Sequence, residues 1–144
     1  MTRFNPLSLL LFAALFVITS GLAKAQQAAP FKATYHDGEN NTTLYLDLDS
    51  ASITAPGYDF LGPMNGYMRG NLQCMWFVVS HKTTSPHKAT ITLANELGSD
   101  SQKAELTTLS PDSIELRLID PIAIKRVVNK KLVKSKSTMH FRRR

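Results

Sequence analysis

Hydrophobic and polar residues alternate with a period of two along several short stretches of this chain. In residues 42–48 leucine stands at every second position, with threonine, tyrosine or aspartate between. The stretches 89–93 and 113–118 repeat this pattern, and 31–35, 103–106 and 138–141 are shorter examples. Alternation of this kind is typical of β-strands that bury one face. We therefore expect strands in all six stretches.

Turn-forming residues lie between these stretches, at 37–41, 98–101, 110–112 and 120–121. Glycine, proline and aspartate favour reversals because each eases a backbone conformation that a tight turn requires. No sustained 3.6-residue periodicity follows residue 25. The sequence thus predicts an all-β fold, a small antiparallel β-barrel or meander sandwich, as a single domain over residues 31–144.

The chain length and strand spacing resemble those of the small exported β-barrels of the lipocalin type. The resemblance is architectural. The Gly-x-Trp signature expected near a lipocalin N-terminus is absent, because Trp76 is the only tryptophan and lies mid-chain. The comparison implies a barrel and carries over no site residue.

The first 25 residues have the layout of a secretory signal peptide. Arg3 precedes an apolar run over 7–22, and Ala23-Lys24-Ala25 provides a small-x-small cleavage site. The alternative is an N-terminal membrane anchor, but the run is shorter than the roughly 20 apolar residues that a spanning helix needs. We expect residues 1–25 to be removed and 26–30 to form a flexible leader. The protein would then be exported, to the periplasm or beyond.

The most apolar run after residue 25 is 72–79, and it does not alternate. One interpretation is a central strand covered on both sides by the neighbouring loop. The other is an exposed stripe that a partner covers. The only cysteine, Cys74, lies in this run. It is expected to be a buried small hydrophobe, the alternatives being an intermolecular disulfide or a reactive thiol.

Residues 56–71 hold four of the seven glycines together with aromatic and methionine side chains. A long connection of this composition is typical of a compact plug that closes one end of a barrel, with Gly66 and Gly70 as strand kinks, or of a lid that contacts a ligand. In the second case the predicted ligand-binding residues are Tyr58, Phe60, Met64, Tyr67 and Met68.

Charge is divided unevenly along the chain, whose net charge is +6. Residues 121–144 carry nine basic side chains and no acidic one, whereas 26–120 carry six basic and eleven acidic. Either the tail pairs internally, with Asp47 and Asp49 as expected partners, or it forms a basic face for lipopolysaccharide, anionic lipid or polysaccharide. Nucleic acid is disfavoured, because few aromatic residues lie among the basic ones. The predicted anion-binding residues are Lys130, Lys131, Lys134, Arg142, Arg143 and Arg144.

No motif with a known catalytic mechanism occurs. The four histidines lack metal-ligand spacing, and no nucleophile elbow or zinc-protease motif is present. Asp47 and Asp49 share one face of a predicted strand and are the best carboxylate pair. The sequence therefore predicts no catalytic residue, metal or cofactor.

Three functional hypotheses follow. The first is an exported, non-enzymatic barrel that binds an apolar or amphipathic ligand or a protein partner, and for a ligand it predicts an internal cavity. The alternative is an envelope interaction module with a solid core, which uses its basic C-terminal face on an anionic surface. The third is a small hydrolase that uses Asp47, Asp49 or a histidine.

Overall fold

The computed structural model describes residues 29–121 and 123–144. The predicted signal peptide and leader residues 26–28 lie outside the described residues. The predicted all-β fold is confirmed: the strands are β1 Lys32–Asp37, β2 Thr42–Asp47, β3 Gly66–Gly70, β4 Trp76–Ser85, β5 Lys88–Asn95, β6 Ser101–Ser110, β7 Ser113–Ile119, β8 Lys125–Val128, β9 Lys131–Lys134 and β10 Thr138–Arg143. One short 3-10 turn, η2, spans Asp59–Leu61.

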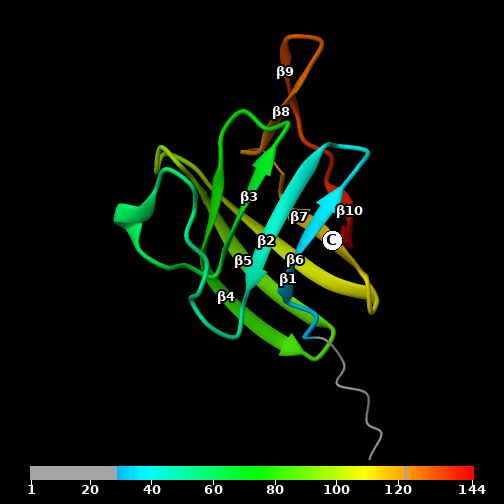
Figure 1. Ribbon diagram of the computed structural model, residues 1–144. Helices are drawn as coiled ribbons and strands as arrows, with labels where there is room; N and C mark the ends of the chain where they lie inside the picture. The colour runs from blue at the N-terminus through cyan, green and yellow to red at the C-terminus, as the bar shows by residue number, and fades with distance from the viewer. Residues whose placement is uncertain (1–28, 122) are drawn as a thin grey trace, which may run out of the picture.

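Eight of these strands close into an antiparallel barrel of the order β1-β10-β7-β6-β5-β4-β3-β2. Strands β1 to β6 each pair with the next in sequence, and β10 closes the ring between β7 and β1. Between β7 and β10 the chain leaves the wall and forms the separate two-stranded sheet β8-β9, which projects from one end of the barrel (Figure 1). Within the described residues no helix is long and apolar enough to cross a bilayer.

The barrel interior is filled by side chains. The alternating positions of the strands point inward, and the largest fully buried side chains come from all eight barrel strands, for example Trp76, Ile91, Leu116 and Phe141. An eight-stranded barrel has an interior just wide enough for side chains to fill. All six stretches predicted from alternation are strands, and most extend beyond their predicted bounds.

A second, smaller apolar cluster lies on the outer wall. Tyr67 and Phe77 alternate with the inward-facing Met68 and Trp76, so they point outward, yet both are buried together with Ala55. The connection between β2 and β3 covers them. The covered-strand interpretation of residues 72–79 is thus confirmed at Phe77 and is wrong at Val79, which is 59% exposed, and β4 begins only at Trp76.

The glycine-rich segment 56–71 does not close an end of the barrel, and that part of the plug interpretation is wrong. Its Tyr58 and Met64 pack against the outer cluster instead, as does Ile53, which precedes the segment. The segment also contains β3, with a glycine at each end. A Cβ at Gly66 would lie 2.2 Å from the carbonyl oxygen of Tyr45, so glycine lets β3 lie close against β2.

Candidate binding surfaces

The two-stranded sheet, hereafter the basic hairpin (residues 125–134), is the most exposed element of the barrel protein. Its strands are joined by Asn129 and Lys130, whose φ angles are 49° and 63°. Positive φ at both central residues defines a type I′ turn, which matches the twist of a two-residue hairpin. β9 is exposed along its whole length, and β8 is exposed except at the half-buried Arg126.

Basic and apolar side chains share both faces of the basic hairpin. On one face Lys125 lies opposite Lys134, and Val127 lies opposite Leu132. On the other face Arg126 lies opposite Val133, and Val128 opposite Lys131. We call the first of these the Val127/Leu132 face.

Contacts to the barrel hold β8 from Lys125 to Val127. The backbone N–H of Gln73 donates to the carbonyl of Lys125 at 2.9 Å. Nδ2 of Asn71 donates to the carbonyl of Val127 at 2.9 Å, and Nη1 of Arg126 donates to Oδ1 of Asn40 at 3.1 Å. Arg126 therefore turns its face of the hairpin toward the barrel, and the Val127/Leu132 face is directed away from it.

The basic hairpin concentrates positive charge on a short element. It carries five basic side chains and no acidic one. Like charges directly opposite one another destabilise a strand pair, and Lys125 and Lys134 have this arrangement. In the tail beyond the hairpin, Lys136 forms an ion pair with Glu39 and His140 lies beside Glu115. The charge of the hairpin is thus available to an external anion.

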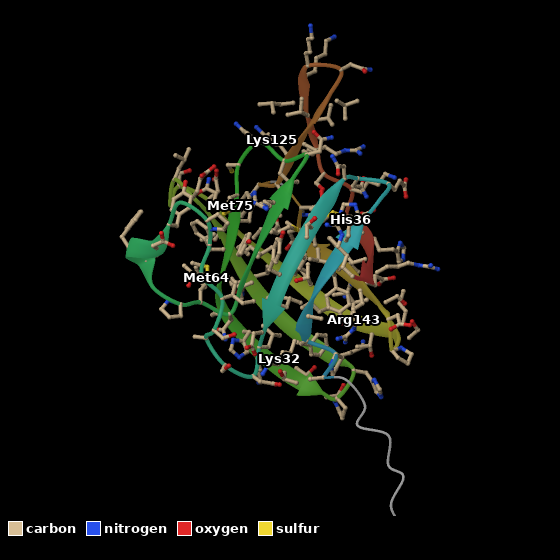
Figure 2. The ribbon with its side chains drawn as sticks, in the orientation of Figure 1. Lys32, His36, Met64, Met75, Lys125 and Arg143 are labelled. Carbon is tan, nitrogen blue, oxygen red and sulfur yellow. The ribbon has the colours of Figure 1, made fainter. Side chains whose placement is uncertain are left out.

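The remaining predicted anion-binding residues lie elsewhere. Figure 2 shows Arg143 low on the barrel, far from Lys125 at the base of the hairpin. The Arg143 guanidinium lies 5.4 Å from the centre of the Tyr35 ring and donates to the Tyr35 hydroxyl at 3.2 Å. The structure therefore divides the six residues into a hairpin group (Lys130, Lys131, Lys134) and a β10 group (Arg142, Arg143, Arg144), in which Arg143 has a structural role.

The five predicted ligand-binding residues are distributed over different environments. Met68 points into the barrel core. Tyr67 is buried in the outer cluster, where its ring stacks on that of Tyr45 with the ring centres 4.4 Å apart. Met64 is half-buried. Tyr58 donates a hydrogen bond to Glu96, which raises the pKa of the Tyr58 hydroxyl.

Phe60 is the most exposed of the five predicted ligand-binding residues, with 81% of its surface accessible to solvent. It lies in η2 next to the exposed Leu61. Leu97, which follows the Tyr58 partner Glu96, is 80% exposed in the β5–β6 turn. We call these three residues the Phe60 surface.

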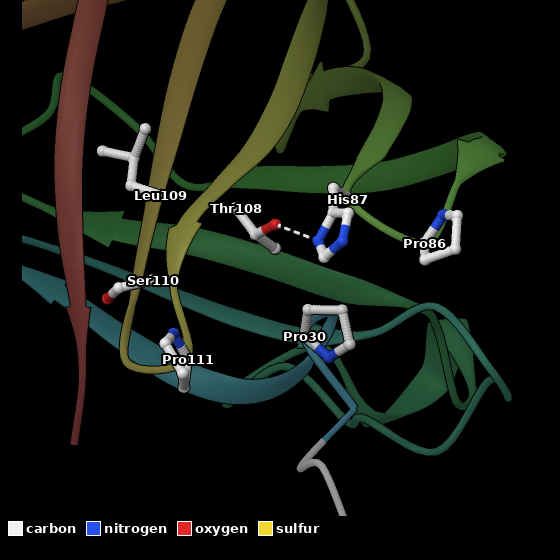
Figure 3. Close-up of a pocket in the computed structure, with 7 residues that line it drawn as sticks. All are labelled: Pro30, Pro86, His87, Thr108, Leu109, Ser110 and Pro111. Atoms are coloured by element: carbon white, nitrogen blue, oxygen red, sulfur yellow. Dashed lines mark hydrogen bonds between the residues drawn. The ribbon is translucent and has the colours of Figure 1, made fainter.

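Two grooves indent the outside of the protein. The first, of about 490 Å³, lies between Pro30, the β4–β5 turn and the end of β6, where His87 is hydrogen-bonded to Thr108 at 2.9 Å (Figure 3). The second, of about 520 Å³, runs beside β2 and β3 and includes Arg69, Cys74 and Arg144. Neither groove is lined by any of the five predicted ligand-binding residues.

The carboxylate pair that was the hydrolase candidate is not arranged for acid–base chemistry. Asp47 is buried, and it accepts hydrogen bonds from the backbone N–H groups of Asp49 and Ser50 at 3.1 and 3.0 Å. The hydrogen bond from the Ser52 hydroxyl is the largest cause that lowers the Asp47 pKa to about 2. The expected pairing of Asp47 with the basic tail is wrong. Asp47 pairs instead with Lys32, whose Nζ lies 4.0 Å from Oδ2 of Asp47.

Cys74 is a half-buried free thiol packed against the core. Burial raises its pKa, and the nearby Glu96 carboxylate adds to the effect. Among the described residues, no three His, Cys, Asp or Glu side chains are grouped as metal ligands.

Two features of the described surface were missed by sequence reasoning: the strands of the basic hairpin, and its exposed apolar residues. The signal was weak, since Asn-Lys is not the usual Asn-Gly of a type I′ turn and the apolar pairs do not alternate with polar residues.

The fold and surfaces define a small, closed, up-and-down β-barrel with a filled interior and a projecting basic hairpin. No family model matches this chain, and no curated protein or solved structure matches it either.

Proposed function

We propose that this protein is a non-enzymatic binding module of the cell envelope, which docks on an anionic surface through the basic hairpin. The observation that carries the proposal is the placement of five basic side chains, with no acidic one, on an element that projects from the barrel. The signal-peptide layout of residues 1–25 is consistent with a protein that functions outside the cytoplasm.

The filled interior favours surface binding over ligand storage. A barrel that holds a small molecule leaves room among its inward-facing side chains. Here Trp76, Met68 and Phe141 occupy that space, and each is at most 1% exposed. Of the three hypotheses, the interaction module is the one that predicts a solid core.

Electrostatics also supports this role. Clustered cations raise the local concentration of an anionic partner, and this attraction weakens as salt screens it. The basic hairpin concentrates its charge on one projecting element. Its base lies beside the β1–β2 turn, where Glu39 is ion-paired with Lys136 outside the hairpin.

The test is a salt series on a sulfated polysaccharide resin. The variant K130Q/K131Q/K134Q removes three charges from the hairpin. The control K82Q/K88Q/K103Q removes three exposed charges from β4, β5 and β6. We expect the hairpin variant to elute at much lower salt than the wild type, and the control to elute close to the wild type. Equal loss in both variants would mean that net charge, and not the hairpin, governs binding.

A second candidate function is docking of a protein partner on the Phe60 surface. Large exposed apolar side chains are typical of protein interfaces. Phe60 and Leu97 are the two most exposed large hydrophobics of the described residues, and the hydrogen bond of Tyr58 with Glu96 links their two segments. A photo-crosslinking residue at position 60, introduced in the native host, should capture one defined protein. Position 103 on the barrel wall serves as the control. Equal capture from both positions would argue against this surface.

A further inference from the structure

We propose that the Val127/Leu132 face of the basic hairpin lies flat on an anionic lipid bilayer, with its apolar pair between the head groups. This inference rests on the proposed function and specifies its partner. It requires the hairpin to offer apolar surface and cations on the same side, and that side to be free of the barrel.

The first requirement is met by the strand register. Val127 and Leu132 face each other across the hairpin and are 38% and 51% exposed. Lys125 and Lys134 are also paired across the hairpin, on the same face and two residues closer to the barrel along each strand. On the opposite side of the apolar pair is the turn that carries Lys130. The apolar pair is therefore bracketed by cations along the hairpin axis.

The second requirement is met by the anchoring of the other face. Arg126 belongs to that face, is half-buried, and donates to Asn40 at 3.1 Å. Its isolated β-bridge with Leu72 holds the edge of β8 beside the barrel. The barrel thus occupies the Arg126 side, and the Val127/Leu132 face is left to solvent.

This arrangement fits a lipid interface better than a soluble polyanion. A polyanion is attracted by the lysines alone and gains nothing from valine and leucine beside them. At an anionic membrane, in contrast, apolar side chains enter the boundary between head groups and acyl chains while lysine ammonium groups stay at the phosphates. Each lysine near such a surface adds to the attraction.

The test compares two ligands with one pair of substitutions. V127T/L132T removes apolar surface and keeps residues with high β propensity, so the hairpin is preserved. The control is V79T, which alters an exposed valine on β4 (59% exposed). Binding is measured by sedimentation with vesicles of phosphatidylcholine and phosphatidylglycerol, and in parallel with soluble dextran sulfate.

We expect V127T/L132T to bind the anionic vesicles on the order of tenfold more weakly than the wild type, while its affinity for dextran sulfate is unchanged. V79T should behave as the wild type with both. Equal vesicle binding by V127T/L132T and the wild type would overturn the membrane inference and leave the proposed function in place. So would wild-type binding to dextran sulfate without binding to vesicles. A wild type that binds neither ligand would overturn both.

Discussion

At the residue scale, Asp47 shows how one buried carboxylate organises a long connection. It ends β2 and accepts hydrogen bonds from Asp49, Ser50 and Ser52, so the chain turns sharply as it leaves the barrel. These bonds favour the ionised form, which is why the pKa of Asp47 is lowered to about 2 from an ordinary value near 3.8.

We predict that Asp47→Asn lowers the melting temperature by several degrees at neutral pH. Because the pKa is lower in the folded protein, the stability that the carboxylate provides is present above about pH 4 and is lost as pH falls through about 2. Thermal unfolding of both proteins from pH 7 to pH 2 checks this. A difference in melting temperature that stays constant over that range would contradict it.

Cys74 supports a second prediction at this scale. The pKa of its thiol is raised, so less of the reactive thiolate is present at neutral pH, and the side chain is half-buried. We expect a thiol reagent at pH 7.5 to label the native protein many times more slowly than the urea-unfolded protein. Similar rates in the two states would mean that the thiol is freely accessible.

At the element scale, β3 depends on a close approach that only glycine permits. A Cβ at Gly70 would lie 2.2 Å from the carbonyl oxygen of Asn41, and the φ angle of 139° disfavours other residues. We predict that Gly70→Ala destabilises the protein by on the order of 1–3 kcal/mol, as measured by urea unfolding.

Gly38 provides the matched control, because nothing lies within 4 Å of the position its Cβ would take. Gly38→Ala should change the free energy of unfolding by less than about 0.5 kcal/mol. If both variants lost the same stability, the close approach of β3 to β2 would not be the cause.

Elements with a clear period of two could be predicted from the sequence, and others could not. Leu44, Leu46 and Ile91 stand at alternating positions whose inward side is the core, so their strands were predictable. β4 continues through polar residues to Ser85 because its backbone pairs with β5 along that length, and residues 80–85 carry no apolar alternation that would reveal this pairing in the sequence. The basic hairpin was missed for a related reason: its stability depends on contacts such as that of Arg126 with Asn40, far away in sequence.

The sequence predicted which residue types the candidate site contains, but not which of them share one surface. The excess of basic residues after residue 120 pointed to an anionic partner. Only the topology separates Lys130 and Lys131 on the hairpin from Arg143, which packs on Tyr35. In the same way, the segment 56–71 looked uniform in sequence, yet Met68 faces the core and Phe60 faces solvent.

At the scale of the whole molecule, the filled barrel leads to a prediction about bound molecules. Its core side chains, among them Leu93, Leu106 and Ile114, are fully buried and leave the interior to protein atoms. Native mass spectrometry of the protein purified from its host should therefore give the mass of the bare chain or a clean multiple of it. A native excess that disappears on denaturation would reveal a bound small molecule and contradict the solid-core interpretation.

The most direct test of the central claim is to shorten the basic hairpin. Replacement of residues 127–132 by Asn-Gly joins Arg126 to Val133, which already face each other, through a type I′ turn and keeps the anchor to Asn40. K82Q/K103Q controls for the loss of two lysines. We predict that the shortened protein has an unchanged melting temperature and loses most of its affinity for vesicles that contain phosphatidylglycerol, whereas the control keeps its affinity. A shortened protein that binds these vesicles as tightly as the wild type would show that the hairpin is not the docking element.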